Sequence, residues 1–367
     1  MQIKNQHIEI KLRGKMLLVY FKLQLLRVCL SVVLFIAAGF LKKLSAQDIH
    51  FSQFFEAPLL RNPALAGLFS GDLRIQGVFR SQWNSITVPY TTGSVNGEYK
   101  LPIGRSNDFL TIGGQLLYDR AGSTAFTSTH ILPMFNYHKS LNSQKSMYIS
   151  AGFMGGLVQR HLDRSKITTN NQFDGINFNP LLPDGETFAN NGYSYFDASA
   201  GISFNMQVTD NVDDNIFAGV AIHHFNKSAK TSFYGNAKIE LNPKWVFSSG
   251  VRMAVTDFSF VTFHGDFSKQ GTNKELIGGM LYSYKLDTPD DPKYVLHAGG
   301  FLRWKDALVP VVKLDYKPFS IALSYDINVS QLKTASQGRG GVEFSLTYQT
   351  FFNRYSSSKD AVLCPRF

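Results

Sequence analysis

Hydrophobic and polar side chains alternate in short blocks along most of the chain after residue 46. The clearest block runs from Phe319 to Val329, where every second side chain is large and apolar and those between are Ser, Ala, Asp or Asn. Residues 341–352 repeat the pattern. Because successive side chains of a strand point to opposite faces, each block predicts an amphipathic strand.

Similar blocks recur often enough to build a large sheet. Their apolar faces are rich in aromatic residues and their polar faces in Ser, Gly and Asn, which suits a lipid-facing exterior and a wet or plugged lumen. Most have the roughly 9–11 residues that a tilted strand needs to cross a bilayer. The prediction is an all-β fold, a transmembrane antiparallel β-barrel of about 14 strands near 72–83, 90–101, 109–119, 126–139, 146–160, 194–206, 214–225, 245–256, 258–268, 274–285, 294–304, 308–316, 319–328 and 339–350.

A soluble β-sandwich would explain the alternation equally well. It explains less well why the segments stay long and why aromatic residues crowd the apolar faces. With an even strand count, both ends of a barrel lie on the periplasmic side. The longest gaps, 161–193 and 226–244, follow the fifth and seventh predicted strands and therefore fall outside, as expected for such barrels.

The first 46 residues are typical of a cleavable export signal. Lys22 and Arg27 precede an apolar run at 28–40, and Leu-Ser-Ala-Gln follows at 44–47. This layout predicts cleavage after Ala46, with Met16 as an alternative start. The apolar run is short for a membrane-spanning helix, so an uncleaved anchor is the weaker interpretation. An exported barrel is expected in the outer membrane of a Gram-negative cell.

Charge and cysteine content exclude several functions. The net charge is +10, but residues 1–46 hold eight of the basic residues and one acidic residue, which leaves 29 bases against 26 acids. A near-balanced mature chain gives no electrostatic basis for binding nucleic acid. Removal of the leader also removes Cys29 and leaves Cys364 alone, so an intramolecular disulfide or a cysteine-based zinc site is impossible.

The sequence contains no convincing catalytic constellation, and we expect no enzyme, cofactor or metal. There is no Gly-x-Ser-x-Gly motif. His223 and His224 are adjacent in a predicted strand, so their rings are expected on opposite faces.

Residues 47–70 have a different composition from the predicted barrel that follows them. Pro58 and the Asn62-Pro63 pair forbid a long strand or helix, whereas Phe51 and its neighbours Phe54 and Phe55 need burial. A plug in the barrel mouth is favoured over a periplasmic docking peptide. The predicted organisation is a signal peptide at 1–46, a plug or docking segment at 47–70, the barrel at 71–352 and a C-terminal tail at 353–367.

Four stretches carry a resemblance to a known family. They are Asp48-x-His-Phe-Ser-Gln-Phe54 with Pro58 and Asn62-Pro63-Ala64 through Gly67, then Arg80-Ser-Gln-Trp-Asn-Ser-Ile86, then Tyr118-Asp-x-Ala-Gly122, and finally Cys364-Pro-Arg-Phe367. Together they resemble the PorP/SprF membrane proteins of the type IX secretion system over essentially the whole mature chain.

The resemblance implies an outer-membrane barrel that serves protein secretion and, in gliding bacteria, the surface display of large adhesins. Implied partners are outer-membrane lipid, the C-terminal signal domain of a secreted cargo protein, and periplasmic and translocon components. A porin or small-solute transporter is the alternative function. The candidate partner-binding residues, from the family motifs and the aromatic outer loop, are Asp48, His50, Phe51, Ser52, Gln53, Phe54, Asn62, Pro63, Arg80, Gln82, Trp83, Phe173, Phe178, Phe188 and Tyr193.

Overall fold

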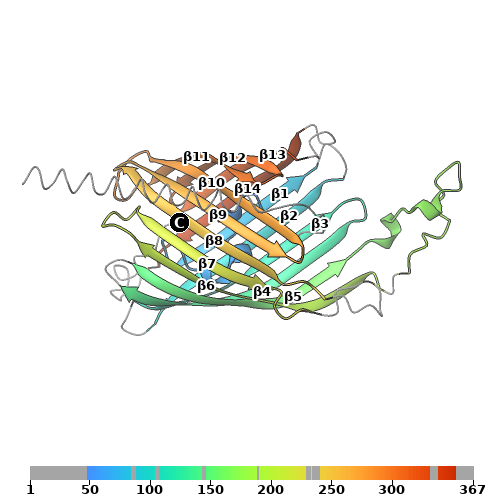
Figure 1. Cartoon of the computed structure of the whole chain (residues 1–367), viewed down its shortest axis with the longest axis horizontal. Helices are drawn as coiled ribbons and strands as arrows, with labels where there is room; N and C mark the ends of the chain where they lie inside the picture. The colour runs from blue at the N-terminus through green and yellow to red at the C-terminus, as the bar shows by residue number, and fades with distance from the viewer. Residues whose placement is uncertain are drawn as a thin grey trace, which may run out of the picture. The chain divides into compact units, whose positions relative to one another are not determined.

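A computed structural model describes residues 48–352 except 84–87, 104–106, 143–145, 188–189, 229–232, 234–239 and 331–337. Fourteen strands dominate the described chain (Figure 1). They are β1 (Leu73–Gln82), β2 (Tyr90–Pro102), β3 (Phe109–Ala121), β4 (Phe126–Asn142), β5 (Met147–His161), β6 (Gly192–Gln207), β7 (Asn215–His223), β8 (Lys244–Thr256), β9 (Ser259–Gln270), β10 (Asn273–Lys285), β11 (Tyr294–Arg303), β12 (Ala307–Tyr316), β13 (Phe319–Asn328) and β14 (Arg339–Thr350).

The strands form one closed antiparallel barrel. Each strand pairs with its neighbours in sequence, and β1 closes the cylinder by pairing with β14 over ten register partners from Leu73↔Thr350 to Gln82↔Gly341. Closure leaves no exposed sheet edge, which a lipid environment requires. The closed barrel confirms the predicted fold and excludes the sandwich.

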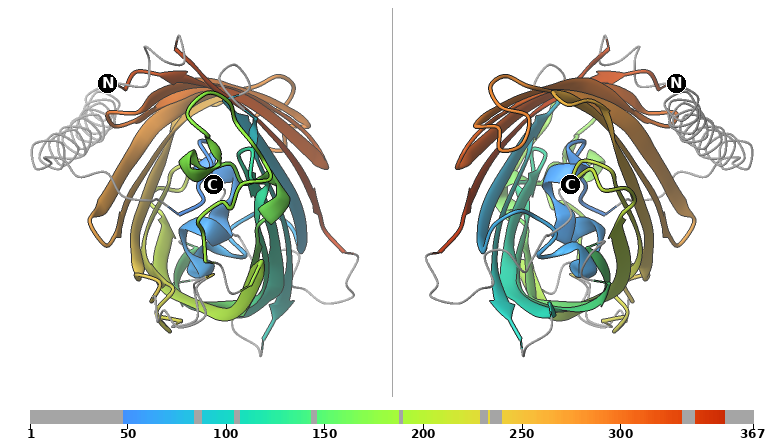
Figure 2. Two further views of the ribbon diagram at one scale, coloured as in Figure 1. Left: turned by 90° about the vertical axis from the view of Figure 1, so that its right-hand side faces the viewer. Right: turned by 90° about the vertical axis from the view of Figure 1, so that its left-hand side faces the viewer.

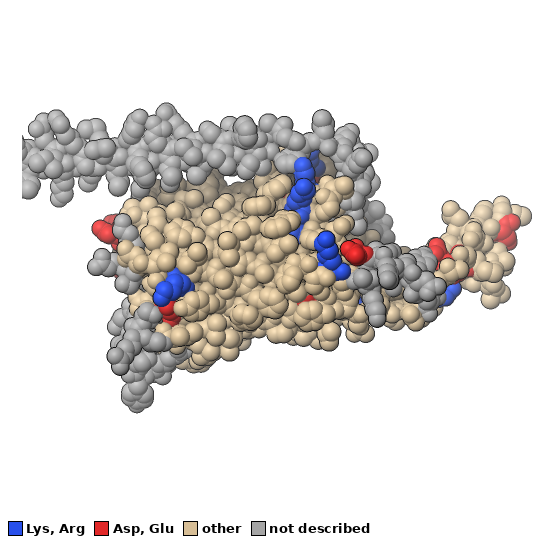
Figure 3. Space-filling model, turned by 60° about the horizontal axis from the view of Figure 1, so that its bottom comes forward, with Lys and Arg blue, Asp and Glu red and all other residues tan. Residues whose placement is uncertain are grey.

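The two faces of the barrel have opposite chemistry. On β13, the outward side chains of Ile321 and Leu323 are 46% and 55% exposed, whereas the inward Ser324 and Asp326 are 3% and 1% exposed. On the outer wall turned toward the viewer in Figure 3, the broad middle lacks charged side chains, and the few that are visible lie toward its two ends. This arrangement of apolar outside and polar inside suits a barrel that is surrounded by lipid.

The two ends of the barrel differ in their connections. One end, here the long-loop end, carries the connections after odd-numbered strands, including residues 162–191 and 224–243. The other end, here the terminal end, carries short turns such as 257–258 and 317–318, together with the start of β1 and the end of β14. Both long connections therefore lie at one end, as predicted, and the known asymmetry of such barrels makes it the extracellular one.

The N-terminal segment, residues 48–70, runs inside the barrel (Figure 2). It contains three short helical turns, η1 (Phe54–Glu56), α2 (Pro58–Arg61) and η2 (Pro63–Leu65). None of the helices in the described part of the chain is long and apolar enough to span a membrane. The predicted signal peptide at 1–46 and tail at 353–367 lie outside the described residues.

The strand boundaries agree with the sequence prediction to within three residues, and β13 and β14 agree at both ends. The largest difference is that β4 continues to Asn142, and another is that β7 stops at His223. β7 ends early because His224 adopts a left-handed backbone conformation with φ 58°, which a strand does not accommodate.

A charge on the outer face tests the lipid-facing assignment. Leu323→Arg should lower the free energy of unfolding by about 2–4 kcal/mol, because arginine is costly at mid-depth in a bilayer. The measurement is urea titration of the barrel refolded into lipid vesicles. Leu323→Phe is the matched control and should be nearly neutral. Equal stability of Leu323→Arg and the wild type would contradict the assignment.

Candidate functional site

The N-terminal segment crosses the lumen from the long-loop end to the terminal end. At the long-loop end, Asp48 lies 3.1 Å from His224 and 3.6 Å from Lys244. At the other end, the backbone nitrogen of Gly67 donates to Glu98 (2.8 Å), and the ammonium of Lys100 donates to the carbonyl of Phe69. The segment is therefore held by the barrel wall along its whole length.

Local sequence explains the shape of the segment. Pro58 occupies the first turn of α2, where its missing N–H costs nothing. Asn62 ends that helix and caps the next one, because its side-chain oxygen accepts from the backbone nitrogen of Ala64 (2.8 Å). The Asn-Pro pair thus makes two short turns back to back, which keeps the segment compact.

An arginine–carboxylate cluster (Arg80, Arg303, Asp326 and Glu343) holds the segment near the long-loop end. Arg80, 2% exposed, lies 2.8 Å from Asp326 and 3.1 Å from Glu343. Arg303 lies 2.9 Å from Asp326. Two like charges, Asp326 and Glu343, can be buried together here because Arg80 contacts both of them and Arg303 contacts Asp326.

The segment completes this cluster. Glu343 accepts from the backbone nitrogens of Ser52 and Gln53, each at 2.7 Å. Arg303 donates to the hydroxyl of Ser52 (2.7 Å), and Arg80 donates to the carbonyl of His50 (2.7 Å). Without the segment these donors and acceptors would lose their protein partners and would depend on water that enters the lumen.

Two further ion pairs hold the middle of the segment. Glu56 accepts from Gln76 (2.6 Å) and Lys313 (2.7 Å), which come from β1 and β12. Arg61 forms a two-bond pair with Asp266 of β9, at 2.7 and 2.6 Å. Bidentate pairing fixes the guanidinium orientation as well as its distance.

Glycines in the wall let the Asn-Pro-Ala turn approach closely. A Cβ at Gly152 of β5 would lie 2.5 Å from the Pro63 backbone, and one at Gly201 of β6 would lie 2.0 Å from the Asn62 side-chain oxygen. The same turn is hydrogen-bonded to the wall, because Asn136 donates to the carbonyl of Ala64 (2.9 Å). This side of the lumen fits the segment tightly.

Aromatic rings cluster on the opposite side of the lumen. Phe54 meets Phe301 edge to face at 5.3 Å, and Phe55 stacks on Phe301 at 5.0 Å and on His264 at 5.8 Å. Phe51 is 3% exposed in a separate small cluster with Ala57. Phe51 and Phe54 are thus buried, and Phe55 is partly buried, by lumen-facing side chains of the barrel.

His224 joins the segment to the wall at the long-loop end. Its Nδ1 lies 2.8 Å from Asp197 and its Nε2 lies 3.1 Å from Asp48. Burial alone would lower its pKa, but the two carboxylates outweigh burial and raise the pKa of His224 to about 9. Lys244 and His224 in turn outweigh burial at Asp48 and hold its pKa well below the ordinary value. At neutral pH this contact is therefore a charged one.

The sequence interpretation of the two histidines was wrong. Both rings are buried, 6.3 Å apart, and His223 lies within hydrogen-bonding distance of Ser199 and the carbonyl of Arg61. They do not alternate across a strand, because the strand ends at His223 and the left-handed backbone turns His224 inward. Within the described residues, no group of His, Cys, Asp or Glu is arranged to hold a metal ion.

The remaining candidate residues are spread over the long-loop end. Gln82 ends β1, and Trp83 follows it and packs on Tyr90 with ring centroids 4.8 Å apart. Phe173 and Phe178 pair in an isolated bridge within the connection after β5, and Tyr193 starts β6 against Phe233. Phe188 lies outside the described residues. The structure thus brings the N-terminal motif and Arg80 together and leaves the aromatic loop residues apart from them.

Sequence reasoning did not single out the wall partners of the segment. The main ones are Glu98, Asp197, Asp266, Arg303, Lys313, Asp326 and Glu343. A usable signal was present, because each is a charged residue on the lumen-facing side of a predicted strand. A charge at such a position needs a partner.

These features define a class of protein: a closed outer-membrane β-barrel whose lumen is occupied by its own N-terminal segment. The family model of the type IX secretion system membrane protein PorP/SprF matches residues 43–348. The chain therefore belongs to the PorP/SprF family, which confirms the resemblance and the outer-membrane location. No curated protein sequence matches it.

Solved structures resemble the chain in fold only. The CymD monoaromatic hydrocarbon channel is 11% identical with a TM-score of 0.45, over 82% of this chain and 94% of that one. A Pseudomonas aeruginosa FadL homologue is 11% identical with a TM-score of 0.40, over 78% and 92%. CdiB from Acinetobacter baumannii is 9% identical with a TM-score of 0.41, over 76% and 60%.

Removal of Arg80 should loosen the segment. Arg80→Ala leaves Asp326 and Glu343 buried without one of their cations, which costs about 3–5 kcal/mol. Hydrogen exchange of the backbone amides at 52 and 53 in lipid nanodiscs should accelerate strongly. Arg120→Ala, at an exposed position on β3, is the control and should leave exchange unchanged. Unchanged protection in Arg80→Ala would contradict the role of the cluster.

The His224 contact should weaken in alkali. The folded-state pKa is raised above the ordinary 6.5, so its stabilisation is complete below that value and disappears as pH rises through about 9. A fluorophore at Ile49→Cys, with Cys364 replaced by Ser, should report greater mobility at about pH 10 than at about pH 7. His224→Gln should remove that difference. A difference that persists in His224→Gln would assign it to another group.

Proposed function

We propose that this barrel binds a large secreted surface protein through that protein's C-terminal signal domain, and anchors it or assists its export. Membership of the type IX secretion family supports this role. The N-terminal segment acts in it as a plug that keeps the barrel closed while the outer connections engage the cargo. Periplasmic and translocon components are the other partners that the family implies.

The observation that carries the proposal is the connection after β5, which extends away from the barrel at the long-loop end (Figure 1). Its Ile176 and Leu181 are 83% and 91% exposed, and Phe173 and Phe178 are about half exposed. Apolar side chains exposed to this degree, outside any lipid-facing strand, favour burial by a partner.

The apolar side chains are presented by a shaped turn. Asp174 accepts from the backbone nitrogens of Ile176 (2.8 Å) and Asn177 (2.7 Å), which holds Ile176 at the tip. Arg164 lies 3.4 Å from Asp184 near the base of the connection. A pre-formed turn with apolar anchors suits protein recognition, because less conformational entropy is lost on binding.

The plug role rests on the buried contacts of residues 48–70. Ser52, Gln53 and Asn62 are fully buried against the barrel, and Asp48 and His50 are the more accessible members at the long-loop end. The first group supports a structural role inside the lumen. The second group could meet a partner that reaches the outer mouth.

The cargo contact can be tested at the exposed tip. The double variant Ile176→Asp/Leu181→Asp should lose the secreted protein that co-purifies with the wild type from native outer membranes, because two buried charges oppose binding. Leu286→Asp makes the same change at an exposed residue of the terminal end and should retain the cargo. Retention by the double variant, with normal barrel levels, would contradict the proposed contact.

A further inference from the structure

Three cavities lie end to end between the N-terminal segment and the wall around β8–β12. The first, at the long-loop end, is lined by Asp48, His50, Lys244, Gln270 and Glu275 among others. The second shares His50, Lys244, Ser268 and Glu275 with the first and continues inward to Arg61 and Asp266. Shared lining residues mean that the two cavities adjoin.

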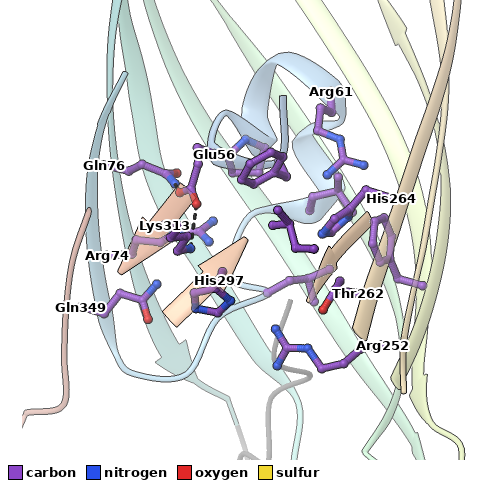
Figure 4. A pocket seen from close by; sticks show the side chains of 16 residues that line it. Glu56, Arg61, Arg74, Gln76, Arg252, Thr262, His264, His297, Lys313 and Gln349 are labelled. Carbon is purple, nitrogen blue, oxygen red and sulfur yellow. Dashed lines mark hydrogen bonds and ion pairs between the residues drawn. The ribbon is translucent and has the colours of Figure 1, made fainter. Parts of the chain in front are cut away.

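The third and largest cavity continues toward the terminal end. It holds about 740 Å³ of empty space, its open mouth included, and it shares Arg61 with the second cavity. Arg252, Thr262 and Gln349 line it from positions near the terminal ends of β8, β9 and β14 (Figure 4). The three cavities together therefore follow the wall from one end of the barrel to the other.

The path is interrupted at Arg61. Its guanidinium is held by Asp266 at 2.6 Å and lies over the rings of Phe54 (4.9 Å) and Phe217 (5.4 Å). Asp266 lines the second cavity only, and Phe217 lines the third cavity only. This ion pair and the two rings form the constriction that separates the outer and inner cavities.

Most of the charged side chains that line the inner cavity are cationic. Arg61, Arg74, Arg252 and Lys313 all contribute to its lining, and Glu56 is the one carboxylate among the described lining residues. Their other carboxylate partners lie outside the lining: Glu98 with Arg74, Asp213 with Arg252 and Asp315 with Lys313. A solute in the cavity therefore meets the cations first, and rings of basic side chains select anions in pores.

We propose that the lumen contains a closed path for small anions along β8–β12, and that the Arg61–Asp266 pair is its gate. Arg61 belongs to the segment and Asp266 to the wall, so a displacement of α2 would separate the pair and connect the cavities. The opposite side of the lumen, where glycines press against the Asn-Pro-Ala turn, would stay closed. This proposal is independent of cargo binding at the outer loop.

The test is planar-bilayer conductance of the purified full barrel in potassium chloride. Wild type should be closed or nearly so. Arg61→Ala and Asp266→Ala should each produce conductance steps absent from wild type, because either change removes half of the gate. Under a salt gradient, the reversal potential should shift toward the chloride equilibrium potential. The charge-swapped Arg61→Asp/Asp266→Arg variant should restore closure.

Two controls separate a gate from a lost segment. Lys285→Ala breaks another buried ion pair of the barrel, with Asp213 (2.7 Å), at a residue that lines none of the three cavities, and should stay closed. A bifunctional thiol-reactive cross-linker between Gln53→Cys and Ser324→Cys, whose parent side chains are 3.0 Å apart, pins the segment in a Cys364→Ser background. Arg61→Ala should still conduct when the segment is pinned.

Three results would overturn the proposal. Arg61→Ala and Asp266→Ala could conduct no more than wild type, which would show that the cavities do not connect. Conductance could be abolished by the pinning cross-link, which would mean that the whole segment leaves. A reversal potential that shifts toward the potassium equilibrium potential would reject anions as the solute. Each result leaves the cargo-binding test unaffected.

Discussion

The structure depends on the neutralisation of charges inside a barrel whose outside is apolar. Asp326 and Glu343 lie on neighbouring strands and are almost fully buried. They are tolerated because Arg80 and Arg303 lie beside them and because the backbone of Ser52 and Gln53 supplies further donors. The segment is therefore not a separate peptide that the barrel merely encloses. Wall and segment are parts of one polar network, in which each supplies hydrogen-bond partners to buried groups of the other.

Most of the fold was predictable from the sequence because one physical rule governs it. A strand between lipid and a polar lumen must alternate apolar and polar side chains. The pattern of a block such as β13 therefore predicts its length, its two faces and its ends. The rule fails where the chain leaves the strand geometry. His223 and His224 are adjacent histidines, but the left-handed backbone at His224 turns its side chain toward Asp48 and Asp197. The pattern of apolar and polar positions does not predict this change in backbone conformation.

The site was predictable in part. The motifs around His50 and Arg80 drew attention to residues that do meet in space, with Arg80 donating to the His50 carbonyl. Their partners could not be named because pairing inside a barrel depends on its circumference. Arg80 faces Glu343 only because β1 and β14 close in one particular register. The aromatic residues of the connection after β5 could be recognised from the sequence, but the turn that Asp174 stabilises around Ile176 could not.

The direct register pairing of Arg80 with Glu343 has a consequence for assembly. These residues lie on the first and last strands, so their contact forms only when the cylinder closes. Glu343 also accepts from the backbone at Ser52 and Gln53, so one carboxylate serves both the seam between the first and last strands and the internal segment. Loss of the segment would therefore weaken closure of the cylinder, and an open seam would weaken the attachment of the segment.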